Sequence, residues 1–212
     1  MKVSEAIERR RSIKYFDPHE QMPAAHWQQL KQLTRRSPTA FNIQNWRFVR
    51  VQDADTRRRI RAAAWDQPQM TDAALLLVIC FDRLAWQRDP ARYWANAPAE
   101  VAAQLVPEIT GFYAADEKLQ RDEGLRSCGI AAQTLMLAAQ ELGYDSCALD
   151  GFDFAEVGRL IRLPEDHEIG LILTIGTALR PAHARPGEID LEECFFDERF
   201  PEHKNAYPEK AG

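Results

Sequence analysis

A basic cluster near the N-terminus carries the clearest potential for binding chemistry. Residues 9–14 read Arg-Arg-Arg-Ser-Ile-Lys, in a chain that is acidic overall. Guanidinium groups and a serine hydroxyl suit a phosphate, because together they offer several donors to its oxygens. The same cations could instead form a solvated face that complements the dipole at the end of a helix. Residue types alone leave both interpretations open.

Three further polar clusters follow along the chain. Residues 37–46 (SPTAFNIQNW) are dense in amide side chains, which suit either a hydrogen-bonded loop or the recognition of a heteroaromatic ring. Residues 149–153 (LDGFD) place Gly151 between an expected strand and an expected helix, where it allows a tight turn or a close approach to a ligand. His183 and Arg185 lie beyond the last expected strand and mean little by themselves.

The motifs of several other enzyme classes are missing from the sequence. It contains no GxGxxG after a strand, no GxxxxGK(S/T) and no GxSxG, which argues against a Rossmann dinucleotide site, a P-loop and a serine hydrolase. The five histidines lack metal-ligand spacing, so no metal is expected. The four cysteines are far apart, and we interpret them as reduced thiols of a cytoplasmic protein.

Charge and hydropathy exclude two classes of partner. The formal net charge of the 212 residues is −5, which does not favour binding to nucleic acid. The longest apolar run spans residues 73–81, and a membrane-spanning helix needs about 20 apolar residues. We therefore expect neither a nucleic-acid partner nor a membrane span, and the N-terminus lacks the apolar core of a secretory signal.

Hydrophobic periodicity predicts a single α+β domain, in which helices cover a mixed central β-sheet. Helices are expected over residues 3–11, 23–36, 55–65 (basic and exposed), 125–142 and from 153 to just before Pro164. Strands are expected over residues 47–51, 73–81, 146–149 and 169–175. The uninterrupted apolar run at 73–81 is typical of a strand covered on both faces. The helix over 125–142 is expected to bury Ile130, Thr134, Leu135, Ala138 and Leu142.

Two segments stand apart from this pattern. Residues 83–124 are rich in charged and aromatic residues and are expected to be helical in part. Phe112 and Tyr113 could stack on a substrate, whereas packing is at least as good an interpretation for Trp86 and Trp94. Residues 180–212 contain several prolines and three closely spaced phenylalanines. A solvated tail is poor in aromatics, so we expect an arm that docks on its own domain or on a partner subunit.

Five segments, in this order, resemble the nitroreductase family of FMN enzymes. They are RRSIKYF at 10–16, SPTAFNIQNWRFV at 37–49, WDQPQMTDA at 65–73, GIAAQTLMLAAQELGYDSCALDGFD at 129–153 and RPAHARP at 180–186. The resemblance spans nearly the whole chain. It implies a nitroreductase-like α+β fold and a homodimer with two FMN sites at its interface. It also implies that the C-terminal arms wrap around the partner.

The resemblance assigns FMN contacts to particular residues of this sequence. The phosphate is expected to be held by Arg10, Ser12 and Arg185, with Arg11 and His183 nearby. Lys14 is expected at the N1/O2 edge of the flavin, and Gln67 and Gln69 at the ring or the ribityl chain. Backbone groups near N5 and O4 are expected from Asp150 and Gly151. Contacts from the other subunit are expected from Pro38, Thr39, Ala40 and Asn42.

The sequence departs from the family pattern at three positions. His183 stands where many relatives have a lysine, so the charge near the phosphate depends on pH. Asp66 stands where an asparagine is common, which puts its contact with the ring in doubt. Gln69 stands where some members have a second lysine, which lowers the positive field near N1.

The implied activity is transfer of hydride from NAD(P)H, through FMN, to an electron-poor small molecule such as a nitroaromatic compound or a quinone, by a ping-pong mechanism. FMN supplies this chemistry and the protein supplies position and electrostatics, so no side chain is assigned as catalytic. Lys14 is expected to stabilise charge at N1/O2. Two alternatives stay open, because one fold serves several functions. They are a specialised enzyme, similar to reductive dehalogenases or flavin-fragmenting enzymes, and a low-turnover FMN-binding sensor.

Overall fold

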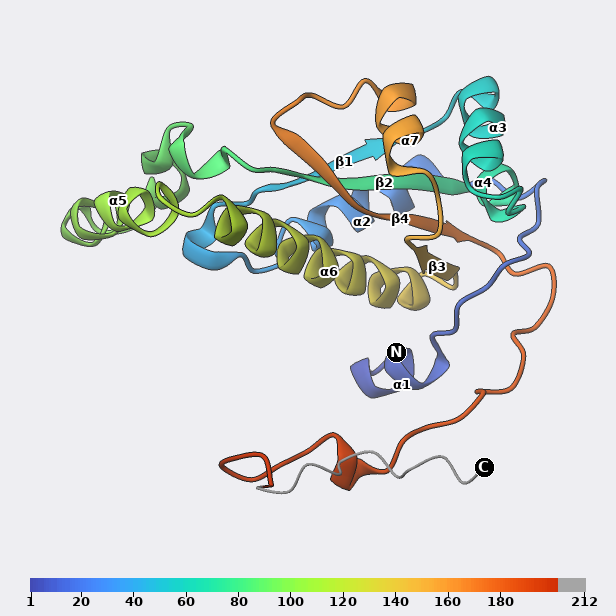
Figure 1. The fold of residues 1–212 in the computed structure, drawn as a ribbon. Coiled ribbons are helices and arrows are strands. Elements are labelled where there is room, and N and C mark those ends of the chain that lie inside the picture. The colour runs from blue at the N-terminus through green and yellow to red at the C-terminus, as the bar shows by residue number, and fades with distance from the viewer. Residues whose placement is uncertain (202–212) are drawn as a thin grey trace, which may run out of the picture. The chain divides into compact units, whose positions relative to one another are not determined.

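The computed structural model describes residues 1–201, which form a sheet between helical layers and a separate C-terminal unit that begins at Ala182 (Figure 1). The strands are β1 (Trp46–Arg50), β2 (Leu75–Asp82), β3 (Asp145–Leu149) and β4 (His167–Gly176). The α-helices are α1 (Val3–Arg9), α2 (Ala24–Thr34), α3 (Ala54–Ala63), α4 (Gln69–Asp72), α5 (Ala99–Tyr113), α6 (Glu117–Glu141) and α7 (Phe154–Ile161). Short 3-10 helices are η1 (Ala40–Asn42), η2 (Ala85–Gln87), η3 (Pro90–Trp94) and η4 (Leu191–Glu193).

The sheet has the strand order β1-β2-β4-β3, and each neighbouring pair is antiparallel. In register, Val78 of β2 lies opposite Ile172 of β4. The expected α+β fold is confirmed. The sheet itself is antiparallel and not mixed as expected, because parallel pairing within residues 1–201 is limited to one isolated bridge between Ser12 and Ser146.

Strand β2 is buried along its whole length because helices cover both faces of the sheet. Alternate residues from Leu75 to Phe81 pack into a cluster with α2 and α6. The intervening Leu76, Val78 and Cys80 pack into a second cluster with α3, α4 and α7. Figure 1 shows α6 and α7 on opposite sides of β2 and β4. The prediction of a strand covered on both faces is confirmed.

Helix α6 begins earlier than the sequence predicted. Asp116 caps it by accepting a hydrogen bond from the Leu119 N–H at 2.9 Å, so the helix starts at Glu117. Gly124 lies inside this helix, and the ring of Phe81 packs against it. A Cβ built on Gly124 would fall 2.0 Å from a carbon of that ring. The expected helix over 125–142 is therefore the C-terminal part of a longer one.

The buried face of α6 differs in part from the prediction. Leu135 and Ala138 are buried as expected, Thr134 and Leu142 are half-buried, and Ile130 is exposed. Small residues occupy the buried positions instead, because they let the helix approach the sheet closely. They are Ser127, Cys128, Ala131, Ala132 and Ala139.

The aromatic residues between β2 and α6 form a third core cluster. Trp86, Tyr93, Ile109 and Tyr113 are buried in it, and Trp94 packs against them. Tyr113 is 1% exposed, so the expectation that it stacks on a substrate is wrong for this chain. Phe112 is exposed, and its ring centroid lies 5.4 Å from that of Phe41.

The C-terminal unit contains η4 and otherwise has no regular element between residues 182 and 201. Phe195 and Phe200 are largely exposed, and the rings of Phe196 and Phe200 lie 4.8 Å apart. The docked arm over 180–212 stays a prediction, and residues 202–212 of it lie outside the described residues. In the part of the chain that the structure covers, none of the helices has the length and apolar character to cross a membrane.

Candidate functional site

Residues 10–17 run as an extended segment beside β3. The Ile13 N–H donates to the Ser146 carbonyl at 3.0 Å, and the Asp17 N–H donates to the Thr177 carbonyl at 2.9 Å. The side chains of Ile13 and Phe16 are buried, which leaves the polar residues between them accessible. This pairing fixes the basic cluster beside the edge strand β3, and no local pattern in the sequence indicates it.

Three of the predicted phosphate and flavin contacts meet at Cys147 of β3. Burial raises the pKa of the Cys147 thiol, whereas the charge of Lys14, a hydrogen bond with Ser12 and the charge of Arg10 lower it. The net rise keeps the thiol neutral, so it offers no nucleophile. Beside it, the buried Ser146 hydroxyl has no hydrogen-bond partner among residues 1–201. The predicted Arg10, Ser12 and Lys14 therefore share one location.

A chain of side-chain amides lies at the other end of β3. The Gln69 amide donates to the Gln67 side-chain oxygen at 2.9 Å, and the Gln67 amide donates to the Gly151 carbonyl at 2.9 Å. The structure thus joins three predicted site residues from two separate segments. Gln69 is 1% exposed, and its Oε1 accepts no hydrogen bond within the described part of the chain. A buried oxygen without a donor costs about 1–3 kcal/mol, so this atom is a candidate acceptor for a donor from a ligand.

An indole ring lies close to Gly151. A Cβ at this position would fall 2.8 Å from Cζ3 of Trp65. Trp65 is exposed and has a positive φ of 52°. Asp150, which directly precedes Gly151, is also exposed. No role was predicted for Trp65 from the sequence, although it is the first residue of the segment over 65–73 that carries Gln67 and Gln69.

The loop over 37–46 is strained and internally bonded. Phe41, Asn42 and Gln44 all have positive φ, a conformation that costs non-glycine residues energy and clusters at functional sites. The Asn42 amide donates to the Tyr93 carbonyl at 2.8 Å, and the Gln44 N–H donates to the Thr39 hydroxyl at 2.9 Å. Contacts of this loop, including Pro38 and Ala40, with a second subunit stay a prediction. His183 and Arg185 belong to the C-terminal unit.

One carboxylate–histidine cluster has the spacing of a metal site. Ligand atoms of Asp82, Asp166 and His167 lie within 4.8 Å of one another. The buried Asp82 carboxylate, however, already pairs with Arg47 at 3.0 Å and Arg88 at 2.8 Å. Two guanidinium groups neutralise the cluster, so it is an ion-pair network that links β1, β2 and β4.

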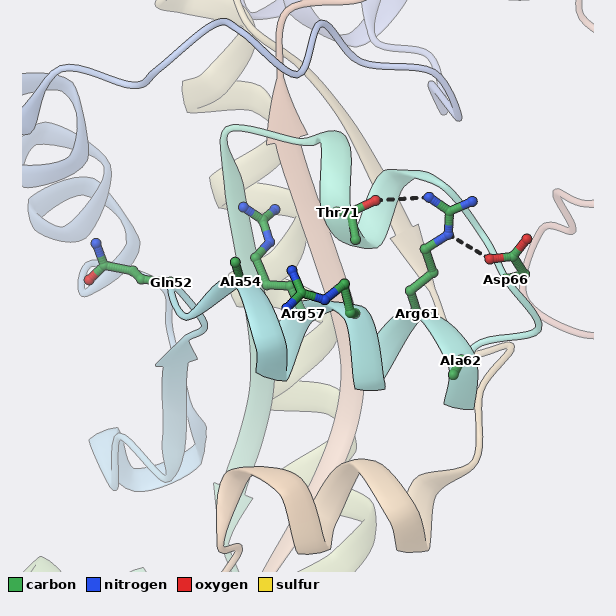
Figure 2. A pocket seen from close by; sticks show the side chains of 8 residues that line it. Gln52, Ala54, Arg57, Arg61, Ala62, Asp66 and Thr71 are labelled. Atoms are coloured by element: carbon green, nitrogen blue, oxygen red, sulfur yellow. Dashed lines mark hydrogen bonds and ion pairs between the residues drawn. The ribbon is translucent and has the colours of Figure 1, made fainter.

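A hollow of about 620 Å³ lies on the outer side of α3 (Figure 2). Arginines 57, 58 and 61 line it together with Asp66 and Thr71. None of the residues assigned to the cofactor lines it. Asp66 and Thr71, however, belong to the loop that carries Gln67 and Gln69, so the hollow borders that loop.

Comparison with known proteins identifies the class of fold and then the family. A protein from Exiguobacterium sibiricum, solved in complex with FMN, shares the fold with a TM-score of 0.86 at 21% identity, over 93% of this chain and 98% of that protein. Protein DrgA from Synechocystis is 46% identical over 196 residues, which cover 90% of this chain and 93% of that protein. The oxygen-insensitive NADPH nitroreductase of Helicobacter pylori is 28% identical, over 76% of this chain and 79% of that enzyme.

Residues 7–177 match the sequence model of the Nitroreductase family. The chain therefore belongs to the nitroreductase family.

Proposed function

We propose that this protein binds FMN along β3 and passes hydride from NAD(P)H to an electron-poor small molecule, such as a quinone or a nitroaromatic compound, by a ping-pong mechanism. Membership of the nitroreductase family supports an oxidoreductase activity. The relative from Helicobacter pylori is named as an NADPH nitroreductase. The four cysteines are free thiols, the state that a reducing cytoplasm maintains, which supports the cytoplasmic location that we propose.

The observation that carries the proposal is the unpaired Oε1 of Gln69. It is buried at the end of the amide chain that includes Gln67 and the Gly151 carbonyl. An isoalloxazine ring or a ribityl chain offers N–H and O–H donors that would satisfy it. Arg10, Ser12 and Lys14 lie at the same strand, where cations suit a phosphate and the electron-rich edge of a flavin. The donor set therefore fits FMN.

Each group has a defined part in this proposal. FMN, when bound, supplies the hydride chemistry. The protein supplies the cation of Lys14 at the pyrimidine edge, the backbone of Asp150 and Gly151 beside the ring, and the acceptor oxygen of Gln69. The proposed phosphate site consists of Arg10, Ser12 and Arg185, with Arg11 and His183 nearby.

We also propose a homodimer, in which Pro38, Thr39, Ala40 and Asn42 reach the cofactor of the partner. Apolar side chains on α1, α2 and α6 support it, because Val3, Ile7, Leu33 and Ile130 are exposed in the single chain. A hollow of about 390 Å³ beside them is lined by Met1, Val3, Leu33 and Leu137. Light scattering of the purified protein tests this part, and a monomeric mass would refute it.

The decisive experiment is the visible spectrum of the purified protein, followed by anaerobic addition of NADH and then NADPH. Flavin bands that bleach with a nicotinamide and return with a quinone or a nitroarene are the expected result. Flavin that does not bleach would favour the specialised enzyme or the sensor over the proposed activity. A protein that takes up no FMN would refute the site itself.

A further inference from the structure

The loop between α3 and β2 carries both glutamines of the proposed FMN site. It spans residues 64–74 and contains Gln67, Gln69 and the short helix α4. Trp65 and Asp66 in this loop both have positive φ, so the backbone is held in a conformation that such residues disfavour. Contacts from outside the loop must therefore keep it in place.

Arg57 of α3 binds the C-terminal part of this loop. Its Nε donates to the Met70 carbonyl at 2.8 Å, and its terminal nitrogen donates to the Ala73 carbonyl at 2.5 Å. Met70 is buried, so the guanidinium satisfies main-chain carbonyls at the end of α4. It fixes the backbone that directly follows Gln69.

Arg61, one helical turn further along α3, binds the N-terminal part of the loop. Its Nε donates to the Asp66 carboxylate at 2.7 Å, and another nitrogen donates to the Thr71 hydroxyl at 3.0 Å. Figure 2 shows both bonds. The Thr71 hydroxyl also lies 3.1 Å from the Pro68 carbonyl, to which it can donate. One guanidinium thus ties together the residues on either side of Gln67 and Gln69.

These bonds decide between two uses of the arginine-lined hollow. The first use would be a site for a free anion, and the second is support of the loop over 64–74. Arg57 and Arg61 each direct two nitrogens to the loop, and Arg58 pairs with Asp55. The hydrogen bonds of Arg57 and Arg61 therefore all go to the loop that carries the glutamines, which favours support of the loop as their use.

We propose that Arg57 and Arg61 are positioning residues, which hold Gln67 and Gln69 in the geometry that receives FMN. This inference rests on the proposed function. It also gives Asp66 a part: its carboxylate is turned toward Arg61 on the outer side of α3 and anchors the loop there. An aspartate at this position strengthens the anchor, because a hydrogen bond between charged groups is stronger than one to a neutral amide.

The test compares single variants by their dissociation constant for FMN and by the visible spectrum and midpoint potential of the bound flavin. Arg57→Gln and Arg61→Gln are expected to raise the dissociation constant at least about fivefold, the equivalent of one lost hydrogen bond. They should also shift the spectrum, because the amides beside the ring move. Arg58→Gln is the matched control, since Arg58 lines the same hollow but, among residues 1–201, bonds to Asp55 and not to the loop. This variant should stay within about twofold of wild type.

Two milder variants keep the test informative if the loss of Arg57 or Arg61 prevents folding. Asp66→Asn retains an oxygen acceptor for Arg61, and Arg61→Lys retains a cation with one donor nitrogen in place of two. Both variants should therefore weaken FMN binding less than Arg61→Gln does. Wild-type protein that binds FMN, with arginine variants that match the control in affinity, spectrum and potential, would overturn this inference alone. Wild-type protein that binds no FMN would overturn the proposed function, and this inference with it.

Discussion

Replacing Gln69 by leucine should change stability and FMN affinity in opposite directions. In the FMN-free protein the substitution removes a buried oxygen that lacks a donor, which recovers about 1–3 kcal/mol. It also removes the bond from the Gln69 amide to Gln67, worth about 0.5–1.5 kcal/mol. Because Gln67 is partly exposed, water can replace that bond. The FMN-free variant should therefore be more stable than wild type, by about 1 kcal/mol.

The same substitution should weaken FMN binding. It removes the acceptor that the ligand donor would meet, and it leaves that donor without a partner in a dry site. The cost is about 1–3 kcal/mol, which corresponds to a dissociation constant about 5 to 150 times higher. Urea unfolding of the FMN-free protein and fluorescence titration with FMN measure the two effects separately.

The matched control is Gln120→Leu in α6. Gln120 is also buried, but its amide donates to the Tyr113 carbonyl at 2.9 Å. Neither of its polar side-chain atoms is among the buried atoms that lack a partner within residues 1–201. This variant should lose about 1 kcal/mol of stability and keep the FMN affinity of wild type. If Gln69→Leu destabilised the protein as much as the control and left FMN binding unchanged, the interpretation of the unpaired oxygen would be wrong.

Three further predictions concern the packing, the electrostatics and the pH dependence. Gly124→Ala should destabilise the protein by about 1–3 kcal/mol in urea unfolding through overpacking, whereas Gly111→Ala, which has no atom within 4 Å of its new Cβ, should gain up to about 1 kcal/mol; effects of equal sign would contradict the packing of α6. Lys14→Met should make the midpoint potential of bound FMN more negative and slow its reduction by NAD(P)H, and wild-type values for both would remove Lys14 from this part. The hydrogen bond from His167 lowers the pKa of Asp166, so the stability it contributes is present above the unfolded pKa of about 3.9 and is lost as the pH falls through the folded pKa. Asp166→Asn should reduce the loss of unfolding free energy that occurs as the pH falls through this range. An unaltered dependence of the unfolding free energy on pH would show that the Asp166–His167 pair does not contribute.

Local signals in the sequence predicted the elements of the fold well. The apolar run at 73–81 predicted a strand covered on both faces, because only a doubly covered strand tolerates such a run. Asp153 predicted the start of α7, and its carboxylate does accept a hydrogen bond from the Glu156 N–H at 3.0 Å. Gly143 predicted the end of α6, and its φ of 84° is one that favours glycine.

What the sequence could not predict depends on contacts between distant segments. The packing of the Phe81 ring against Gly124 is invisible in the sequence. The predicted helix therefore began at residue 125, whereas α6 begins at Glu117. The helix over 55–65 reads as basic and exposed, but an arginine side chain is long enough to reach main-chain carbonyls of a neighbouring loop. Arg57 is half-buried for this reason, and neither it nor Arg61 was expected to support the site.

The site residues divide in the same way. Arg10, Ser12 and Lys14 were predicted through a resemblance, and the structure adds why they lie together: the segment over 10–17 pairs with β3. The amide chain from Gln69 through Gln67 to Gly151 joins segments whose proximity no local pattern indicates. The contacts expected of Arg11, His183, Arg185 and the loop over 38–42 stay predictions.

The pairing of the N-terminal segment has a consequence for how the protein is made. Ile13 bonds to Ser146 and Asp17 bonds to Thr177, so residues 13–17 can form these bonds only after residues 146 and 177 have been synthesised. Closing so long a loop is slow compared with local pairing. The basic cluster therefore reaches its place beside β3 only when β4 is complete. The proposed FMN site, which includes this cluster, would therefore be complete only late in folding.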